Sequence, residues 1–407
     1  MPYLAPRFLT LVVVIAVARL IGLIFRKLKQ PPVMGEVLGG IILGPSVLGY
    51  FFPTLTSSLF HTDAIEFLKH ISEIGISLYL FVIGLEVDLP RLKKSARSAI
   101  AISQLSIAVP FILGLILANQ IYVHNAPVGF GRLEFSLFVG VSLSITAFPV
   151  LARILADSPL HKTRIGDLAL TCAAINDISA WCLISVITGV AGSTLSGVGV
   201  TLVLTISYIL FMMLVVRPLL ENLIPKLERQ FERLPESLLA FAILGALLSA
   251  TITESIGIHA LFGAFLFGAI LPNKSLIAVD VSGRLQDFVR ILFLPAFFAL
   301  TGIKTQLGLL SGWQDWSLTG IIIILAIIGK FGGAYLGAVF SGNTRRESAI
   351  LGLLMNTRGL VELIILNIGL SIGILTPRLF TMLVLMALVT TLMAGPLIHL
   401  IGTEKIK

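Results

Sequence analysis

Long apolar runs separated by short polar segments make up almost the whole sequence. A run of about 20 apolar residues is the length that crosses a hydrocarbon core of roughly 30 Å as a helix. The runs are too long, and alternate too little, for the strands of a membrane barrel. The pattern therefore predicts an all-α integral membrane protein with 13 transmembrane helices. These spans are expected at residues 8–25, 33–50, 71–88, 99–118, 135–154, 166–189, 198–216, 236–252, 256–272, 288–303, 318–340, 348–370 and 379–401.

The composition also indicates a membrane protein. Apolar residues make up 57% of the chain and charged residues 12%, against about 25% charged residues in soluble proteins, and the mean hydropathy is +1.02. Lysine and arginine gather in alternate loops, as the positive-inside rule describes for cytoplasmic loops. This distribution predicts an outside N-terminus and a cytoplasmic C-terminus, and it explains the net charge of +8 without a nucleic-acid partner. The basic loops lie at residues 26–29, 91–97, 153–164, 217–233, 274–290, 345–346 and 405–407.

The two halves of the chain share weak similarities in the same order, seven spans apart. Gly39 in "GGIILGPSVLG" aligns with Gly263 in "GAFLFGAILP". Gly84 in "LFVIGLEVDL" aligns with Gly302 in "FFALTGIKTQL", and "SITAFPVLARIL" aligns with "MNTRGLVELIIL". Because seven is odd, the second copy has to be inverted in the membrane, as in many transporters. The sequence therefore predicts two inverted six-helix repeats joined by the seventh span.

The third of these pairs carries helix breakers in both copies, Pro149 in one and "NTRG" with Gly359 in the other. Proline removes a backbone hydrogen bond and glycine loosens a helix. Transporters place charges and ions at the half-helix ends that such breaks create. Ser144 and Thr146 offer oxygen atoms near the first break. We therefore expect broken helices at a transport site, the alternative being a purely structural kink.

The segment "TCAAINDISAWC" places Asn176 and Asp177 in the middle of the sixth span. An ionisable side chain at the bilayer centre costs at least about 2.5 to 3.5 kcal/mol, so it requires a function or a partner. A carboxylate suits a hard cation, and Asp177 is predicted to bind Na⁺ or K⁺ and a proton in turn. Asn176 can orient a partner or donate a hydrogen bond but cannot itself carry a proton, and it is assigned to the ion-binding site with Asp177, Thr146 and Ser144. The alternative is a buried acid that its neighbours satisfy.

Three further charges lie within two later spans. Lys330, halfway along the eleventh span, is the natural counter-charge for Asp177, or else a lysine held only by backbone carbonyls. Arg358 and Glu362 are four residues apart in the broken twelfth span, a spacing that pairs charges along one helix face. Alternatively, Arg358 neutralises the carbonyl ends of the break in the fifth span. In both cases we expect a mainly structural role.

Motifs of enzymes are not found in the sequence. It contains no Walker loop, dinucleotide fingerprint, Cys/His metal cluster or catalytic triad spacing. We therefore expect neither enzymatic chemistry nor a bound cofactor.

Six motifs together resemble the monovalent cation:proton antiporter-2 family, which is related to glutathione-gated potassium efflux proteins, bacterial sodium/proton exchangers and plant cation/proton exchangers. They stand in the order that this family shows, and they cover nearly the whole chain. The resemblance implies antiport by an elevator-type movement, with a homodimer as the assembly. The motifs are "PPVMGEVLGGIILGPSVLG", "LFVIGLEVDL", "SLSITAFPVLARIL", "AAINDISAW", "GIHALFGAFLFGAILP" and "LLMNTRGLVELIIL".

The resemblance also implies a division into domains and roles for single residues. Asp177 becomes the acid that carries ion and proton, Asn176 its neighbour, Lys330 the core lysine and Thr146 a residue near the helix crossing. An Asn–Asp pair implies electroneutral one-for-one exchange, whereas Asp–Asp accompanies electrogenic exchange. The implied domains are a core of residues 99–190 and 311–407, a dimerisation domain of residues 1–98 and 236–310, and a linker helix within residues 191–235.

Two other functions stay open at this point. A sodium-coupled symporter of an organic anion also uses inverted repeats and broken helices, and a channel or sensor module would use Asp177 as a gating charge. The sequence names neither the cation nor the membrane, which is a bacterial-type inner membrane or an organellar one. Many members of the family carry a cytosolic nucleotide-binding domain after the membrane part. Two alternatives follow: a short member of the family, or a membrane part that has a cytosolic regulatory domain outside these residues as a partner.

Overall fold

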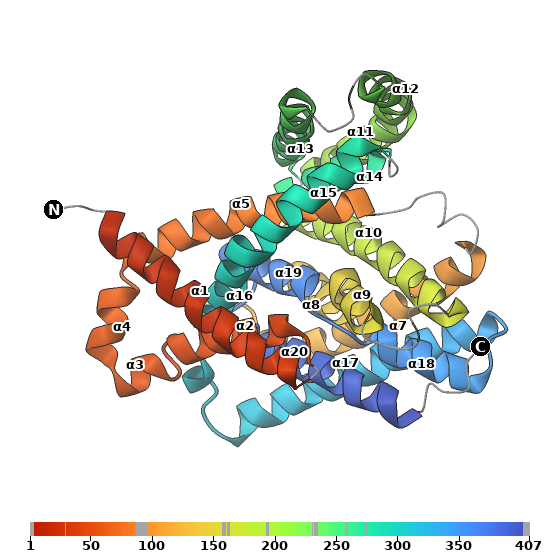
Figure 1. Cartoon of the computed structure of the whole chain (residues 1–407). Coiled ribbons are helices and arrows are strands. Elements are labelled where there is room, and N and C mark those ends of the chain that lie inside the picture. The colour runs from red at the N-terminus through yellow and green to blue at the C-terminus, as the bar shows by residue number, and fades with distance from the viewer. Residues whose placement is uncertain are drawn as a thin grey trace. The chain divides into compact units, whose positions relative to one another are not determined.

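The computed structural model describes residues 4–28, 30–86, 96–156, 160, 163–192, 195–229, 231, 235–257, 259–272 and 275–401. Every regular element within these ranges is a helix (Figure 1). The all-α prediction is therefore confirmed for this part of the chain. Part of the basic loops lies outside it, namely Lys29, Arg91, Lys93, Lys94, Lys162, Arg233, Lys274, Lys405 and Lys407.

The helices fall into two compact units, of which the first comprises Met1–Ala64, Lys93–Ile184 and Phe298–Lys407. This unit contains the candidate site. Its helices are α1 (Leu4–Lys27), α2 (Pro32–Leu43), α3 (Leu48–Phe51), α4 (Pro53–Leu59), α7 (Ala96–Asn125), α8 (Arg132–Ser144), α9 (Phe148–Ala156), most of α10 (Arg164–Gly192), most of α16 (Leu294–Lys304), η4 (Leu307–Leu309), α17 (Trp313–Phe340), α18 (Arg345–Met355), α19 (Leu360–Ser371) and α20 (Pro377–Ile401).

The second unit comprises Ile65–Leu92 and Ser185–Phe297. The predicted core and dimerisation domains divide the chain at other places, and that division stays a prediction. The helices of the second unit are most of α5 (Thr62–Glu86), α11 (Leu195–Phe211), η2 (Met212–Val216), α12 (Arg217–Glu228), α13 (Glu236–Ile256), α14 (Ala260–Ile270), α15 (Leu276–Phe288) and η3 (Val289–Phe293).

Many of these helices are long and apolar enough to cross a membrane. Among the described residues ten helices or continuous helix runs meet this condition, and the pair α18 and α19, bent by 42° at its break, makes an eleventh. One further apolar helix, α14, is shorter than these. The prediction of a multi-pass membrane protein is confirmed, whereas the number of 13 spans stays a prediction.

One predicted span proves to be only the end of a longer helix. The expected span 288–303 belongs to a longer helical run, α15, η3 and α16, which continues from Leu276 to Lys304. This run begins after Ser275, whose hydroxyl accepts a backbone hydrogen bond at 3.1 Å and so caps the helix. Its polar first turns contain Asp280 and Arg284, which pair at 3.6 Å. An apolar run marks membrane depth and not the start of a helix, because helical hydrogen bonding continues through paired polar residues.

Glycines bring α17 against α7 in the first unit. Gly329, Gly333 and Gly337 recur every four residues and so share one face of α17. A Cβ atom at Gly337 would lie only 2.8 Å from the Cα atom of Ile102 on α7. Lys330 follows the first of these glycines and is fully buried. The close approach of the two backbones therefore fixes the helix that carries the buried lysine.

A second close approach joins α2 to α16. A Cβ atom at Gly40 would lie 2.7 Å from the Cα atom of Ala299, and one at Gly302 would lie 2.7 Å from the Cα atom of Gly40. The second unit has a comparable contact between α5 and α14, where a Cβ atom at Gly84 would lie 3.0 Å from the Cα atom of Gly268. Small residues allow helices in membranes to pack this closely.

Replacing Gly40 by alanine is expected to destabilise the protein. The added methyl group has only backbone atoms to displace, and overpacking of this kind costs about 1–3 kcal/mol. The matched control is Gly320→Ala on α17, where a Cβ atom meets nothing within 4 Å. Size-exclusion profiles after heating in detergent should give a lower midpoint for the first variant only. Equal midpoints would show that α2 and α16 separate easily.

Candidate functional site

Two interrupted helices meet at the centre of the first unit. The segment between α8 and α9 contains Thr146, whose hydroxyl donates to the Met355 carbonyl oxygen at 2.8 Å. The next residue, Ala147, donates its backbone N–H to the carbonyl oxygen of Thr357 at 3.1 Å. Met355 ends α18, and Thr357 lies in the break before α19. The two breaks predicted from sequence therefore hydrogen-bond directly to each other.

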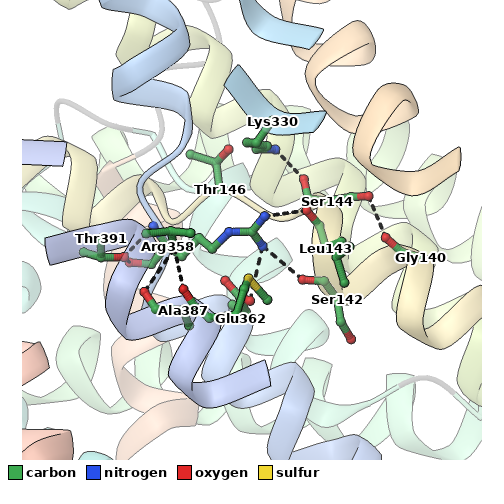
Figure 2. Close-up of polar contacts among 12 residues, drawn as sticks. Gly140, Ser142, Leu143, Ser144, Thr146, Lys330, Arg358, Glu362, Ala387 and Thr391 are labelled. Atoms are coloured by element: carbon green, nitrogen blue, oxygen red, sulfur yellow. Dashed lines mark hydrogen bonds and ion pairs between the residues drawn. The ribbon is translucent and has the colours of Figure 1, made fainter. Parts of the chain in front are cut away.

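The C-terminal end of α8 is covered by two cationic side chains (Figure 2). Arg358 donates to the carbonyl oxygens of Ser142 at 3.1 Å and of Leu143 at 2.6 Å. Lys330 donates through its Nζ atom to the carbonyl oxygen of Ser144. The last carbonyls of a helix lack intrahelical partners and carry the negative end of its dipole. Two basic side chains, Arg358 from the second break and Lys330 from α17, thus cover this end.

Arg358 also belongs to a buried ion pair. Its Nη1 atom lies 3.2 Å from Oε1 of Glu362 in the first turn of α19, and both side chains are 0% exposed. Its backbone is fixed by Thr391 of α20, whose hydroxyl accepts from the Arg358 N–H at 2.9 Å and donates to the Arg358 carbonyl oxygen at 2.8 Å. Both roles expected for Arg358, pairing with Glu362 and covering the carbonyl ends of α8, are therefore present together.

Asp177 faces the opposite half of the same interrupted span. It lies in α10 and is 3% exposed. Its Oδ1 atom accepts a long hydrogen bond from the backbone N–H of Phe148, the first residue of α9, at 3.5 Å. A helix N-terminus carries partial positive charge and attracts anions. The break thus presents a negative end to Lys330 and Arg358, and a positive end to Asp177.

Lys330 contacts the backbone of α8 rather than the carboxylate of Asp177. Its Nζ atom donates to the carbonyl oxygen of Ser144, while Asp177, Arg358 and Glu362 act on it through their charges. Of the two roles expected for this lysine, the contact with a backbone carbonyl is direct and the compensation of Asp177 acts over a longer distance. The side chain of Ser144 bonds within its own helix, to Gly140.

Asn176 is held by a residue that the sequence did not single out. Its Nδ2 atom donates to the hydroxyl of Ser106 on α7 at 3.0 Å. Its Oδ1 atom is buried and accepts no hydrogen bond within the described part of the chain, and the same holds for Oδ1 of Asn356 in the second break. The sequence signal that could have indicated Ser106 is a serine within an otherwise apolar span.

No group of three or more His, Cys, Asp or Glu side chains that could hold a metal ion occurs among the described residues. Asp177 is a single carboxylate, so a cation bound to it would have to draw its other ligands from amide, hydroxyl or carbonyl oxygens or from water. Monovalent cations accept such oxygen ligands, whereas a resident transition metal requires a denser set of imidazoles or thiolates. The groups around Asp177 are therefore oxygen donors.

Known proteins with similar sequences fall into one family. The family model described as "Sodium/hydrogen exchanger, transmembrane" matches residues 12–403. The chain is 43% identical over 390 residues to the Na(+)/H(+) antiporter NhaS4 of Synechocystis sp., covering 95% of each protein. It is 38% identical to cation/H(+) antiporter 20 of Arabidopsis thaliana, covering 94% of this chain and 47% of that protein. It is 35% identical to K(+)/H(+) antiporter 1 of Saccharomyces cerevisiae, covering 95% and 45%. The chain thus spans nearly all of the first relative and about half the length of the other two.

Solved structures agree with the fold. The sodium proton antiporter MjNhaP1 from Methanocaldococcus jannaschii, at pH 8, matches with a TM-score of 0.69 over 97% of this chain and 95% of that chain. The sequence identity is 15%, so this likeness shows the fold alone. The family itself follows from the matched model and the relatives above. The chain belongs to the transmembrane sodium/hydrogen exchanger family and is one of the monovalent cation:proton antiporters.

Proposed function

We propose that this protein is a secondary active antiporter that exchanges protons for Na⁺ or K⁺, with Asp177 binding the proton and the cation in turn. The observation that carries the proposal is the buried carboxylate of Asp177 at the N-terminus of an interrupted helix. A carboxylate in this place can hold either a proton or a hard cation, and the two exclude each other. Competition for one acid couples the two fluxes. The relatives support both cations, because one is named a Na(+)/H(+) antiporter and another a K(+)/H(+) antiporter.

The charges around Asp177 support electroneutral exchange. Arg358 and Glu362 form an ion pair of their own, and Lys330 is bonded to the backbone of α8. Asn176 cannot titrate, so a single group in the predicted Asn–Asp pair changes its protonation. A proton or a monovalent cation then brings the same charge of plus one to the site. One pH unit is worth about 1.4 kcal/mol, enough to drive roughly a tenfold cation gradient in one-for-one exchange.

Movement of an elevator type would expose Asp177 to each side in alternation. In this proposal residues 99–190 and 311–407 move as a core against residues 1–98 and 236–310. The glycine contacts support this division, because α7 meets α17 within the proposed core, while α2 meets α16 and α5 meets α14 within the proposed dimerisation domain. Helices joined by backbone contact have little freedom to slide separately.

Several features of the assembly belong to the same proposal. They are 13 spans in two inverted repeats, an outside N-terminus and a cytoplasmic C-terminus, a homodimer, and a regulatory cytosolic domain as partner. The basic loops support the orientation. Aligned glycines support the repeats, because Gly84 and Gly302, which match in sequence, both lie at close helix contacts.

Transport by purified wild-type protein tests the proposal. Liposomes with an imposed pH gradient receive Na⁺, K⁺ or Li⁺ outside, a dye follows lumenal pH, and an oxonol dye follows membrane potential. We expect at least one monovalent cation to collapse the gradient without an oxonol signal. A gradient that no cation collapses would contradict antiport, and a potential that accompanies the collapse would contradict one-for-one exchange. Sodium-dependent uptake of an organic anion without proton counterflow would favour a symporter instead.

A further inference from the structure

Two buried serines of α7 face α10 just where Asn176 lies. Ser103 donates its hydroxyl to the carbonyl oxygen of Cys172 at 3.3 Å. Ser106 donates its hydroxyl to the carbonyl oxygen of Ser103 at 2.9 Å. Both serine side chains are completely buried. Polar groups in this position hold two helices at a fixed distance and leave few alternative hydrogen bonds.

The hydroxyl of Ser106 decides which end of the Asn176 amide it meets. A serine hydroxyl has one proton to donate and two lone pairs that accept. The proton of Ser106 is engaged with Ser103, so the hydroxyl can only accept from a neighbour. The amide of Asn176 supplies the donor through Nδ2 at 3.0 Å. Turning the amide over would face its oxygen with a lone pair, unless the hydroxyl of Ser106 gave up its bond to Ser103.

The opposite end of this amide is left without a partner. Oδ1 of Asn176 is buried, 1% of the residue is exposed, and no hydrogen bond reaches this oxygen from the described residues. Buried polar atoms are normally paired, and an unpaired one in a native structure calls for an explanation. The next residue along α10 is Asp177. An amide oxygen is a suitable ligand for a hard monovalent cation.

We propose that Ser106 is a positioning residue that fixes the Asn176 amide with its oxygen free, so that this oxygen is a neutral ligand for the cation bound by Asp177. This inference rests on the proposed antiport and specifies how the site holds its cation. A proton on Asp177 needs no second ligand, whereas a cation does. Ser106 therefore acts on the affinity for the cation and not on the maximal rate of exchange.

The backbone of α7 supports this arrangement from the other side. A Cβ atom at Gly333 of α17 would lie 3.1 Å from the Cα atom of Ser106, so α17 packs directly on this turn of α7. Ser106 thus sits between α17 and α10. The short side chain of Ser106 leaves its hydroxyl little freedom on this packed helix, as a group that orients a ligand requires.

Transport kinetics of Ser106→Ala test the inference. Without the hydroxyl, the amide of Asn176 is free to turn, and its oxygen is offered to the cation for only part of the time. We expect the KM for the cation to rise about fivefold to tenfold, the factor expected for one lost hydrogen bond, with an unchanged maximal rate. A general loosening of the fold would lower the maximal rate as well. Ser106→Thr keeps the hydroxyl and is expected to restore the KM.

Two companion variants keep the inference falsifiable. Ser103→Ala removes a buried hydroxyl of the same helix that does not touch Asn176, and it should keep the wild-type KM. Ser106→Cys preserves the volume of the side chain while weakening the acceptor, and it serves if the alanine variant does not fold. A wild-type KM in the Ser106 variants, or the same rise in Ser103→Ala, would overturn the inference and leave antiport through Asp177 intact. Absence of exchange in the wild type would instead overturn the proposed function.

Discussion

Replacing Asp177 by asparagine is expected to reduce cation-driven collapse of a pH gradient to the rate of protein-free liposomes. Asparagine has nearly the volume of aspartate and can still accept the N–H of Phe148 through its amide oxygen, so the fold should persist. It cannot bind a proton, and it offers no negative charge to a cation. Both halves of the exchange are therefore lost together. The measurement is the dye signal of lumenal pH after addition of each cation in turn.

The matched control is Asp167→Asn, in the first turn of the same helix, α10. This residue is exposed, so the same chemical change occurs outside the buried site. Exchange by the control should equal that of the wild type. If Asp177→Asn still exchanged protons for a cation, the acid that couples the fluxes would have to be another residue, and the symporter and channel interpretations would gain support.

Replacing Arg358 by methionine is expected to destabilise the protein strongly. The substitution leaves Glu362 buried without its partner and uncovers the carbonyl oxygens of Ser142 and Leu143. Removing one partner of a buried ion pair typically costs about 3–5 kcal/mol, because the other charge stays uncompensated. The thermal midpoint of the purified protein, followed by intrinsic fluorescence, should fall clearly below that of the wild type.

An exposed pair with the same spacing provides the control. Arg217 and Glu221 are also four residues apart and lie 2.8 Å from each other, with 27% and 47% of their side chains exposed. Surface pairs of this kind contribute about 0–1 kcal/mol, so Arg217→Met should leave the midpoint almost unchanged. The double variant Arg358→Met with Glu362→Gln should recover part of the loss, because no charge is then left unpaired. Equal midpoints for the two single variants would mean that the buried pair contributes nothing to stability.

The interrupted helices could be predicted because their signals are local. Proline and glycine weaken a helix locally, so Pro149 and Gly359 marked the two breaks, and the ends of α8 and α18 lie near them. The signal is not sufficient by itself, because Pro110 lies inside the unbroken helix α7. Asp177 stood out because a carboxylate in an apolar span is rare. Arg358 and Glu362 were paired correctly because a spacing of four residues brings side chains together on one helix.

Contacts between helices that are distant in the chain could not be predicted from the sequence. Nothing in the chain order says that Lys330 bonds to Ser144 or that Ser106 holds Asn176, because these pairs are separated by more than 60 residues. A periodicity places a residue on a face of its own helix and leaves the opposing helix unknown. For Lys330, the sequence suggested the carboxylate of Asp177 as the partner. The contact with the carbonyl end of α8 could not be predicted, because it depends on how the break folds.

The cover over the end of α8 bears on how the protein distinguishes one alkali ion from another. Filters that strip an ion of water do so with a set of backbone carbonyl oxygens. Here the carbonyls of Ser142, Leu143 and Ser144 are occupied by the resident side chains of Arg358 and Lys330. Under the proposed antiport, these three oxygens are not available to replace the hydration shell of an ion, which then keeps part of that shell. Discrimination between Na⁺ and K⁺ then follows the free energy of partial dehydration, and a modest selectivity is the expected result.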